Sequence, residues 1–206
     1  MRSSRWPAMP EGLRIAGGPR RRSFLAAGLA WPLWPAAAAD DEVARLLRQG
    51  GAVIAFRHAL APGTFDPPGF KPGVCSTQRN LSDEGRAQAR RIGEWFGARG
   101  LKPAQVRSSP WCRCLDTATL AFGAAESWAA LGSPRGATES TNAQSLAELR
   151  LALAAASVPG RPFEAWVTHM FVLSDLAGTN SASGEGLVLR TDGAGGVKVL
   201  GRLQVS

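Results

Sequence analysis

Three short segments of strand character alternate with segments of helical character, and this alternation limits the fold more than any other feature of the sequence. We interpret residues 52–56 (AVIAF), 105–109 (QVRSS) and 163–169 (FEAWVTH) as strands. Helices are predicted between and around them, and residues 186–203 read as two further strands joined by a glycine-rich turn. The alternation predicts an α/β fold: a three-layer sandwich with a mostly parallel central sheet.

The helices are predicted from their ends and their apolar spacing. One begins after Ser82, an N-cap residue followed by two acids, and stops near residues 97–100. The other helices are predicted over residues 41–49, from Pro110 through Leu120, and over 143–156. Residues 60–80 are rich in proline and glycine, so we expect a long loop there, and loops of this length usually carry function.

The N-terminal 39 residues have the features of a secretory signal of the twin-arginine type. Arg21 and Arg22 precede an apolar run, and Ala37 to Ala39 form a plausible cleavage site. A transmembrane anchor is the alternative, but the run is short and Pro32 interrupts it. We therefore expect a periplasmic or secreted domain over residues 40–206, with no stable membrane span after cleavage.

The leader also accounts for most of the basic charge. Six arginines and one glutamate give it about +5 of the formal net charge of +8, so the rest of the chain is close to +3. Nucleic-acid binding is therefore not expected, because its main electrostatic support lies in the part that is removed.

Three cysteines follow the leader: Cys75, Cys112 and Cys114. In an oxidising compartment Cys75 can pair with either of the others, whereas a zinc site would need more ligands and a different spacing. Our hypothesis is a bridge between Cys75 and Cys112 that ties the long loop to the helix after the second strand. Cys114 would then point into the core.

Polar groups follow three of the predicted strands. Arg57 and His58 follow the first, Ser108 and Ser109 end the second, and His169 ends the third. In parallel sheets ligands bind beyond the carboxyl ends of the strands. Each group alone has an ordinary structural explanation, but together with Arg113, in the first turn of a helix, they suit a phosphoryl group.

These segments resemble the histidine phosphatase superfamily, which has a phosphoglycerate mutase-like fold. The resemblance rests on four segments in the family's order: FRHA (56–59), RNLSDEGRAQA (79–89), VRSSPWCRCLDTA (106–118) and VTHMFVLSDLAG (167–178). It implies that His58 is a nucleophile that forms a phosphohistidine. It also implies that Arg57, Arg113 and His169 complete a phosphate pocket, with no metal and no cofactor; Arg79 is a weaker candidate for contact with the substrate.

Two positions depart from the family pattern. Ala59 stands where the family usually has glycine, giving RHA in place of RHG. The glutamate with which many members protonate the leaving group has no counterpart in residues 128–136. Asp66 and Glu185 are the alternatives for that role, and the sequence does not decide between them.

We therefore expect an exported, metal-independent phosphomonoesterase. Its substrate would be a phosphorylated small molecule or a phosphate ester of the cell envelope, such as one on lipopolysaccharide. The alternative, which the missing acid and Ala59 favour, is a periplasmic pseudoenzyme that binds phosphate esters without turnover.

Overall fold

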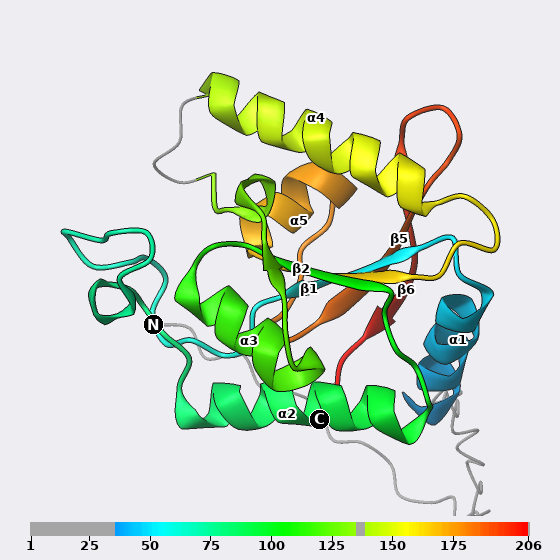
Figure 1. Cartoon of the computed structure of the whole chain (residues 1–206), viewed down its shortest axis with the longest axis horizontal. Helices are drawn as coiled ribbons and strands as arrows, with labels where there is room; N and C mark the ends of the chain where they lie inside the picture. The colour runs from blue at the N-terminus through cyan, green and yellow to red at the C-terminus, as the bar shows by residue number, and fades with distance from the viewer. Residues whose placement is uncertain (1–35, 135–138, 206) are drawn as a thin grey trace, which may run out of the picture. The chain divides into compact units, whose positions relative to one another are not determined.

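A six-stranded sheet with helices on both faces forms the centre of the computed structural model (Figure 1). The structure describes residues 36–134 and 139–205, and side chains in residues 40–134 and 142–205. The strands are β1 (Val53–Arg57), β2 (Gln105–Ser108), β3 (Glu126–Ser127), β4 (Glu164–Thr168), β5 (Gly186–Thr191) and β6 (Val197–Leu203).

The strand order is β3-β2-β4-β1-β5-β6. β3, β2, β4 and β1 pair in parallel, whereas β5 is antiparallel to both β1 and β6. The prediction of a mostly parallel sheet is therefore confirmed. The antiparallel part is the hairpin at residues 186–203, because two strands joined by a short turn have to run in opposite directions.

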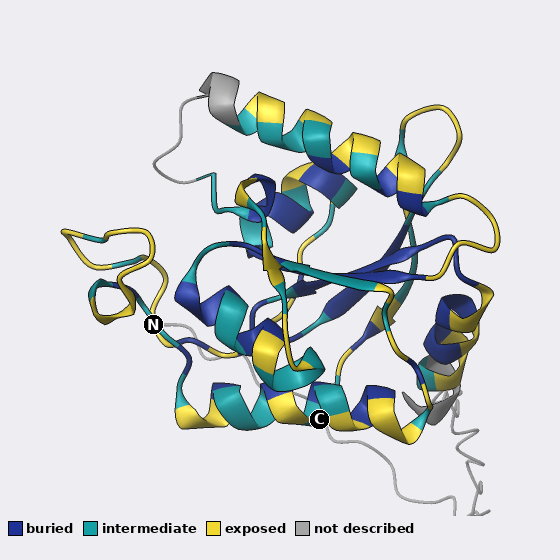
Figure 2. Ribbon diagram, viewed as in Figure 1, coloured by how far each residue is buried: buried dark blue, intermediate teal, exposed yellow. Residues whose placement is uncertain are grey.

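Alternate residues of the strands enter two separate apolar cores, one on each face of the sheet. Ile54 and Phe56 pack with α1 (Ala36–Gln49), α2 (Asp83–Ala98) and α3 (Cys112–Phe122). Val53 and Ala55 pack with α4 (Glu139–Ala156), α5 (Met170–Ala177) and the short helix η2 (Ala129–Leu131). Figure 2 shows the strands buried between these helices, as expected for the predicted three-layer sandwich.

Most predicted elements are present, with differences at their ends. The N-cap at Ser82 is confirmed, since its side chain accepts a hydrogen bond from the backbone N–H of Gly85. The prediction that a helix opens at Pro110 is wrong by two residues, because α3 begins at Cys112. The Trp111 N–H instead reaches the Ser109 hydroxyl, and the Cys112 N–H donates to Oε1 of Gln78.

The sequence analysis did not predict α5, β3 or the two 3-10 helices, η1 (Cys75–Thr77) and η2. All are short. α5 has eight residues, begins directly after His169, and ends at Gly178, whose φ of 66° lies in the left-handed region that glycine adopts most readily. A single apolar run of that length does not separate a helix from a strand by its pattern.

The predicted bridge between Cys75 and Cys112 is confirmed, and Cys114 is a buried free thiol. The disulfide joins the long loop to the first residue of α3. The loop is as irregular as predicted, with η1 as its one helical turn among the described residues.

The predicted leader lies outside the described residues, apart from residues 36–39, whose backbone forms the first turn of α1. The proposed cleavage site therefore falls at the start of a helix. Within residues 36–134 and 139–205, no helix combines the length and the apolar character that crossing a membrane requires.

Candidate active site

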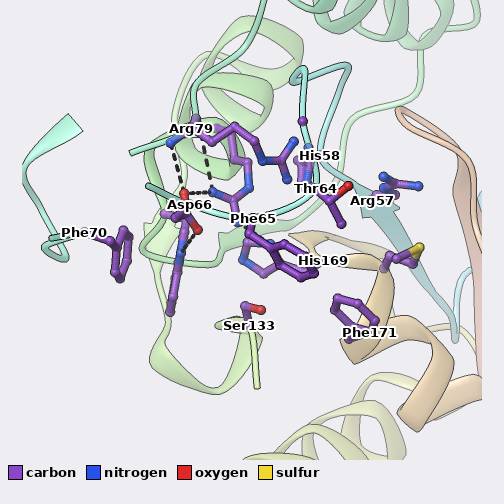
Figure 3. Close-up of a pocket in the computed structure, with 14 residues that line it drawn as sticks. Arg57, His58, Thr64, Phe65, Asp66, Phe70, Arg79, Ser133, His169 and Phe171 are labelled. Carbon is purple, nitrogen blue, oxygen red and sulfur yellow. Dashed lines mark hydrogen bonds and ion pairs between the residues drawn. The ribbon is translucent and has the colours of Figure 1, made fainter. Parts of the chain in front are cut away.

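A cavity of about 440 Å³ opens at the carboxyl ends of β1, β2 and β4. All five residues that the sequence analysis selected line it: Arg57, His58, Arg79, Arg113 and His169. Figure 3 labels all of these except Arg113, together with residues of the long loop that line the same cavity. The spatial requirement of the hypothesis, that groups far apart in the chain meet in one cavity, is therefore met.

The pairing of β1 with β4 brings the two histidines together. In their parallel register Arg57 is opposite Thr168, so the residues that follow, His58 and His169, leave the sheet side by side. The His58 N–H donates to the Thr168 carbonyl at 2.9 Å, and the two imidazole rings lie 5.6 Å apart. Both rings are almost completely buried.

The hydrogen bond made by His58 determines which of its nitrogens is reactive. Nδ1 lies 2.8 Å from the carbonyl oxygen of Ala59, an acceptor, so Nδ1 carries the proton. Burial, followed by the positive charges of Arg113, Arg79 and Arg57, lowers the pKa of His58 to about 3. The imidazole is therefore neutral at physiological pH, and Nε2 keeps the lone pair that a nucleophile needs.

His169 is also neutral, but both of its ring nitrogens are engaged within the protein. Arg113 Nη2 donates to Nδ1 at 3.4 Å, so the ring proton is on Nε2, which is 2.8 Å from the Ser109 hydroxyl. Burial, and after it the positive charge of Arg113, holds the pKa of His169 well below its usual value. His169 thus fixes the position of Arg113 rather than presenting a free lone pair.

Three arginines give the cavity its charge. Arg57 is held by the Ser181 carbonyl, Arg79 by the Ala61 carbonyl and Arg113 by the Asp66 carboxylate. The Nε atoms of all three are buried and make no hydrogen bond to described residues. Burial lowers the pKa of Arg57 and of Arg79. A buried cluster of donors that lacks acceptors is suited to an oxyanion.

Asp66 is the one carboxylate among the described residues that line the cavity. It accepts hydrogen bonds from the Arg79 N–H at 3.0 Å, from Arg113 Nη1 at 2.8 Å and from Trp111 Nε1 at 3.3 Å. Burial alone would raise the pKa of Asp66, but these bonds and the charge of Arg113 outweigh it and lower that pKa. Asp66 is therefore an ionised group that positions Arg113 and Trp111, and a poor proton donor.

Glu185, the other acid considered from the sequence, does not line the cavity. Its carboxylate accepts from the Ala182 N–H at 2.7 Å and from Arg202 Nη1 at 2.9 Å. Its backbone carbonyl accepts from the Arg57 N–H at 3.0 Å, so Glu185 helps to position the backbone of Arg57 at the end of β1.

The buried thiol of Cys114 lies behind the second histidine, with Sγ 3.6 Å from Nε2 of His169. It lies near enough to the Thr168 carbonyl to donate to it, at 3.5 Å. Burial raises the pKa of Cys114 to about 12, so the thiol is protonated and unreactive. Its place in the structure is that of a small core residue, as expected.

Sequence reasoning missed the aromatic wall of the cavity. The side chains concerned are those of Phe65, Phe70, Trp111 and Phe171. Trp111 stacks on Phe70 with ring centroids 5.4 Å apart, and it meets the His169 ring edge to face at 5.2 Å. Phe65 and Phe70 lie in the long loop that was expected to carry function, but no local signal showed that their rings would line the cavity.

Residues that could hold a metal are scarce. The described side chains contain no group of three or more histidine, cysteine, aspartate or glutamate residues arranged to bind an ion. The charge that faces the cavity comes from guanidinium groups instead.

Comparisons with known proteins relate part of the chain to one family model. Residues 74–131 match the family model for the histidine phosphatase superfamily, branch 1. That stretch includes Arg79 and Arg113 but neither histidine. No curated protein sequence matches the chain significantly.

Solved structures share the fold at low sequence identity. The protein histidine phosphatase SixA, solved with tungstate, is 17% identical, with a TM-score of 0.51 over 74% of this chain and 96% of its own. A mutant phosphoserine phosphatase from Entamoeba histolytica, solved with phosphoserine, is 13% identical, with a TM-score of 0.51 over 75% and 98%. The open reading frame Rv3214 from Mycobacterium tuberculosis is 16% identical, with a TM-score of 0.52 over 72% and 94%.

Identities this low establish the fold alone. The chain has the phosphoglycerate mutase-like fold of the histidine phosphatase superfamily, and it matches branch 1 of that superfamily over residues 74–131.

Proposed function

We propose that the protein is an exported, metal-independent phosphomonoesterase that acts through a phosphohistidine on His58. The observation that carries the proposal is the state of this imidazole. It is neutral, its proton is held on Nδ1 by the Ala59 carbonyl, and it lines a cavity together with three arginines. A neutral nucleophile beside an anion-binding cluster is the arrangement that phosphoryl transfer to histidine requires.

The reaction has two steps. The phosphate dianion of the ester is bound by the guanidinium groups of Arg57, Arg79 and Arg113. The Nε2 lone pair of His58 then forms a bond to phosphorus, while the bond from phosphorus to the ester oxygen breaks. The leaving oxygen departs with the bonding electron pair and takes a proton from solvent water to give the alcohol. A water molecule next attacks the phosphohistidine and gives up a proton to solvent. The P–N bond breaks, and its electrons return to Nε2 as inorganic phosphate is released.

The three arginines supply the electrostatic stabilisation in this reaction. Their positive charges stabilise the phosphoryl oxygens during transfer, the role that a metal ion has in other phosphotransferases. His169 and Asp66 hold Arg113 from two sides, so its guanidinium does not have to be ordered when the substrate binds.

Export is part of the proposal and has separate support. The twin-arginine segment precedes an apolar run, and the disulfide between Cys75 and Cys112 is of a kind that persists in oxidising compartments. Replacing Arg21 and Arg22 by lysine should abolish the appearance of the protein outside the cytoplasm in cell fractionation. Unchanged export of that variant would contradict this part.

A second candidate function is phosphate-ester binding without turnover. It is favoured by Asp66, since the single carboxylate among the described lining residues is bound to three donors and is not available as an acid. Such a protein would bind phosphate stoichiometrically but would not form a phosphoprotein.

The deciding experiment uses phenyl phosphate with EDTA present and traps the intermediate by rapid quenching. We expect phosphate release and a base-stable phosphoprotein, with both lowered at least about a thousandfold by His58→Ala. The matched control is Arg86→Ala, which removes an arginine that pairs with Asp116 outside the cavity and should leave turnover unchanged. Full activity of His58→Ala would exclude the proposed nucleophile.

A further inference from the structure

The lining of the cavity has two chemically different components, one charged and one aromatic. Besides the arginines and histidines, the cavity is lined by four aromatic side chains and a methionine: Phe65, Phe70, Trp111, Met170 and Phe171. With a volume of about 440 Å³, the cavity falls in the range of small-molecule sites and has room for much more than a phosphate group.

Two of these rings are held in place by the phosphate site itself. Phe65 is 57% exposed, yet it directly precedes Asp66, whose carboxylate accepts three hydrogen bonds. Phe171 lies in the first turn of α5, two residues after His169. Both rings are therefore presented beside the anion site from anchored backbone (Figure 3).

A third ring of the cavity lining is that of Trp111. Trp111 is fixed by its hydrogen bond to Asp66 and by stacking on Phe70. Its ring also fits closely against Gly132, where a Cβ atom would approach the indole to 2.8 Å. Trp111 is thus a fixed part of the wall, and aromatic surfaces favour flat ligands in offset or edge-to-face contact.

Uncharged polar groups that line the cavity are few. The uncharged hydroxyl-bearing residues that line it are Thr64 and Ser133, and the carboxylate of Asp66 is occupied by its three donors. A sugar phosphate would leave many hydroxyls without partners, and a phosphoamino acid would leave its ammonium group without a free carboxylate.

We propose that the preferred substrates are phosphomonoesters whose alcohol carries an uncharged aromatic ring next to the phosphate, with Phe65 and Phe171 contacting that ring. This inference rests on the proposed function, since it names the substrate class of the same site. It also makes a separate claim about binding, which does not require turnover.

The test has to separate ring recognition from leaving-group chemistry. Benzyl phosphate, cyclohexylmethyl phosphate and glycerol 2-phosphate all release alkyl alcohols, so their chemical reactivity is comparable. We expect kcat/KM for benzyl phosphate to be about tenfold higher than for glycerol 2-phosphate. It should also be several-fold higher than for cyclohexylmethyl phosphate, because a flat ring packs better against aromatic side chains.

Variants then assign the preference to particular rings. Phe65→Ala and Phe171→Ala should each reduce the ratio of kcat/KM for benzyl phosphate to that for glycerol 2-phosphate at least about threefold. The matched control is Val74→Ala, which shortens an exposed apolar residue of the same loop outside the cavity and should keep the ratio. Equal kcat/KM values for the three esters, or a ratio that survives both phenylalanine variants, would overturn the inference.

A binding measurement distinguishes failure of this inference from failure of the proposed function. Calorimetry on the intact protein compares benzylphosphonate with methylphosphonate, neither of which is hydrolysed. Binding of benzylphosphonate about tenfold tighter supports the aromatic site even if no ester is turned over. Equal binding of the two phosphonates rejects the aromatic site even if esters are hydrolysed.

Discussion

The disulfide between Cys75 and Cys112 offers a test of how the site is held together. Reducing the disulfide, or replacing Cys75 by serine, removes a covalent link between two positions that are 37 residues apart in the chain. In the chain-entropy account a closed loop of this length stabilises the folded state by about 4 kcal/mol, since the unfolded chain regains the freedom that the bridge removed.

Two contacts should retain part of the local order after the bridge is lost. The Gln78 side chain still accepts from the Cys112 N–H at 3.0 Å, and Asp66 still pairs with Arg113 at 2.8 Å. We therefore expect Cys75→Ser to fold, with its free energy of unfolding lowered by about 3 to 4 kcal/mol. For a domain of this size that corresponds to a fall in Tm of about 6 to 16 °C.

The assay is chemical unfolding followed by tryptophan fluorescence, with and without a reductant. Cys75 is exposed, so its replacement leaves no buried cavity, and the loss should be entropic. A reductant should destabilise the wild type by a similar amount and should leave Cys75→Ser unchanged. A variant that unfolds within about 1 kcal/mol of the wild type would refute the reasoning, as would an equal effect of reductant on both proteins.

Two further predictions concern charge in the cavity. Asp66→Asn should lower kcat/KM for phenyl phosphate and for benzyl phosphate by similar factors of about ten, because the carboxylate positions Arg113. Steady-state kinetics measures both values. A loss confined to benzyl phosphate, whose alcohol is the poorer leaving group, would instead make Asp66 the proton donor. The folded-state pKa of His58, about 3, lies below the ordinary value of 6.5, so the unfolded chain binds an extra proton as the pH falls below 6.5. On account of this residue, the free energy of unfolding should decrease by about 1.4 kcal/mol per pH unit from pH 6.5 toward 3. Urea titrations at several pH values measure this slope, and the same slope in His58→Ala as in the wild type would contradict the prediction.

The order of the elements could be read from local sequence patterns. The apolar strand ending at Arg57, the Ser82 cap and the hairpin at 186–203 are signals carried by neighbouring residues, and each is present in the structure. The same locality explains the failures. α5 is too short for its periodicity to be recognised. The start of α3 shifts from Pro110 to Cys112 because Trp111 has an extended backbone conformation and is the N-cap.

Parts of the site followed from fold class and spacing alone. Once the sheet is parallel, strand ends meet at one edge, so Arg57, His58 and His169 were expected at the same edge. That they are direct neighbours follows from the pairing of β1 with β4. The pairing of Cys75 with Cys112 was also within reach, since three cysteines leave few choices.

What the sequence determined by itself is therefore the alternation of strands and helices, and with it the edge of the sheet where the imidazoles and two of the guanidinium groups emerge. Only the tertiary structure decided that Asp66 pairs with Arg113 across 47 residues, that Arg79 faces the cavity, and that Phe65 stands beside the anion site. The physical reason is that secondary structure depends on residues a few positions apart. The path of a twenty-residue loop depends instead on the contacts of its whole length with distant elements.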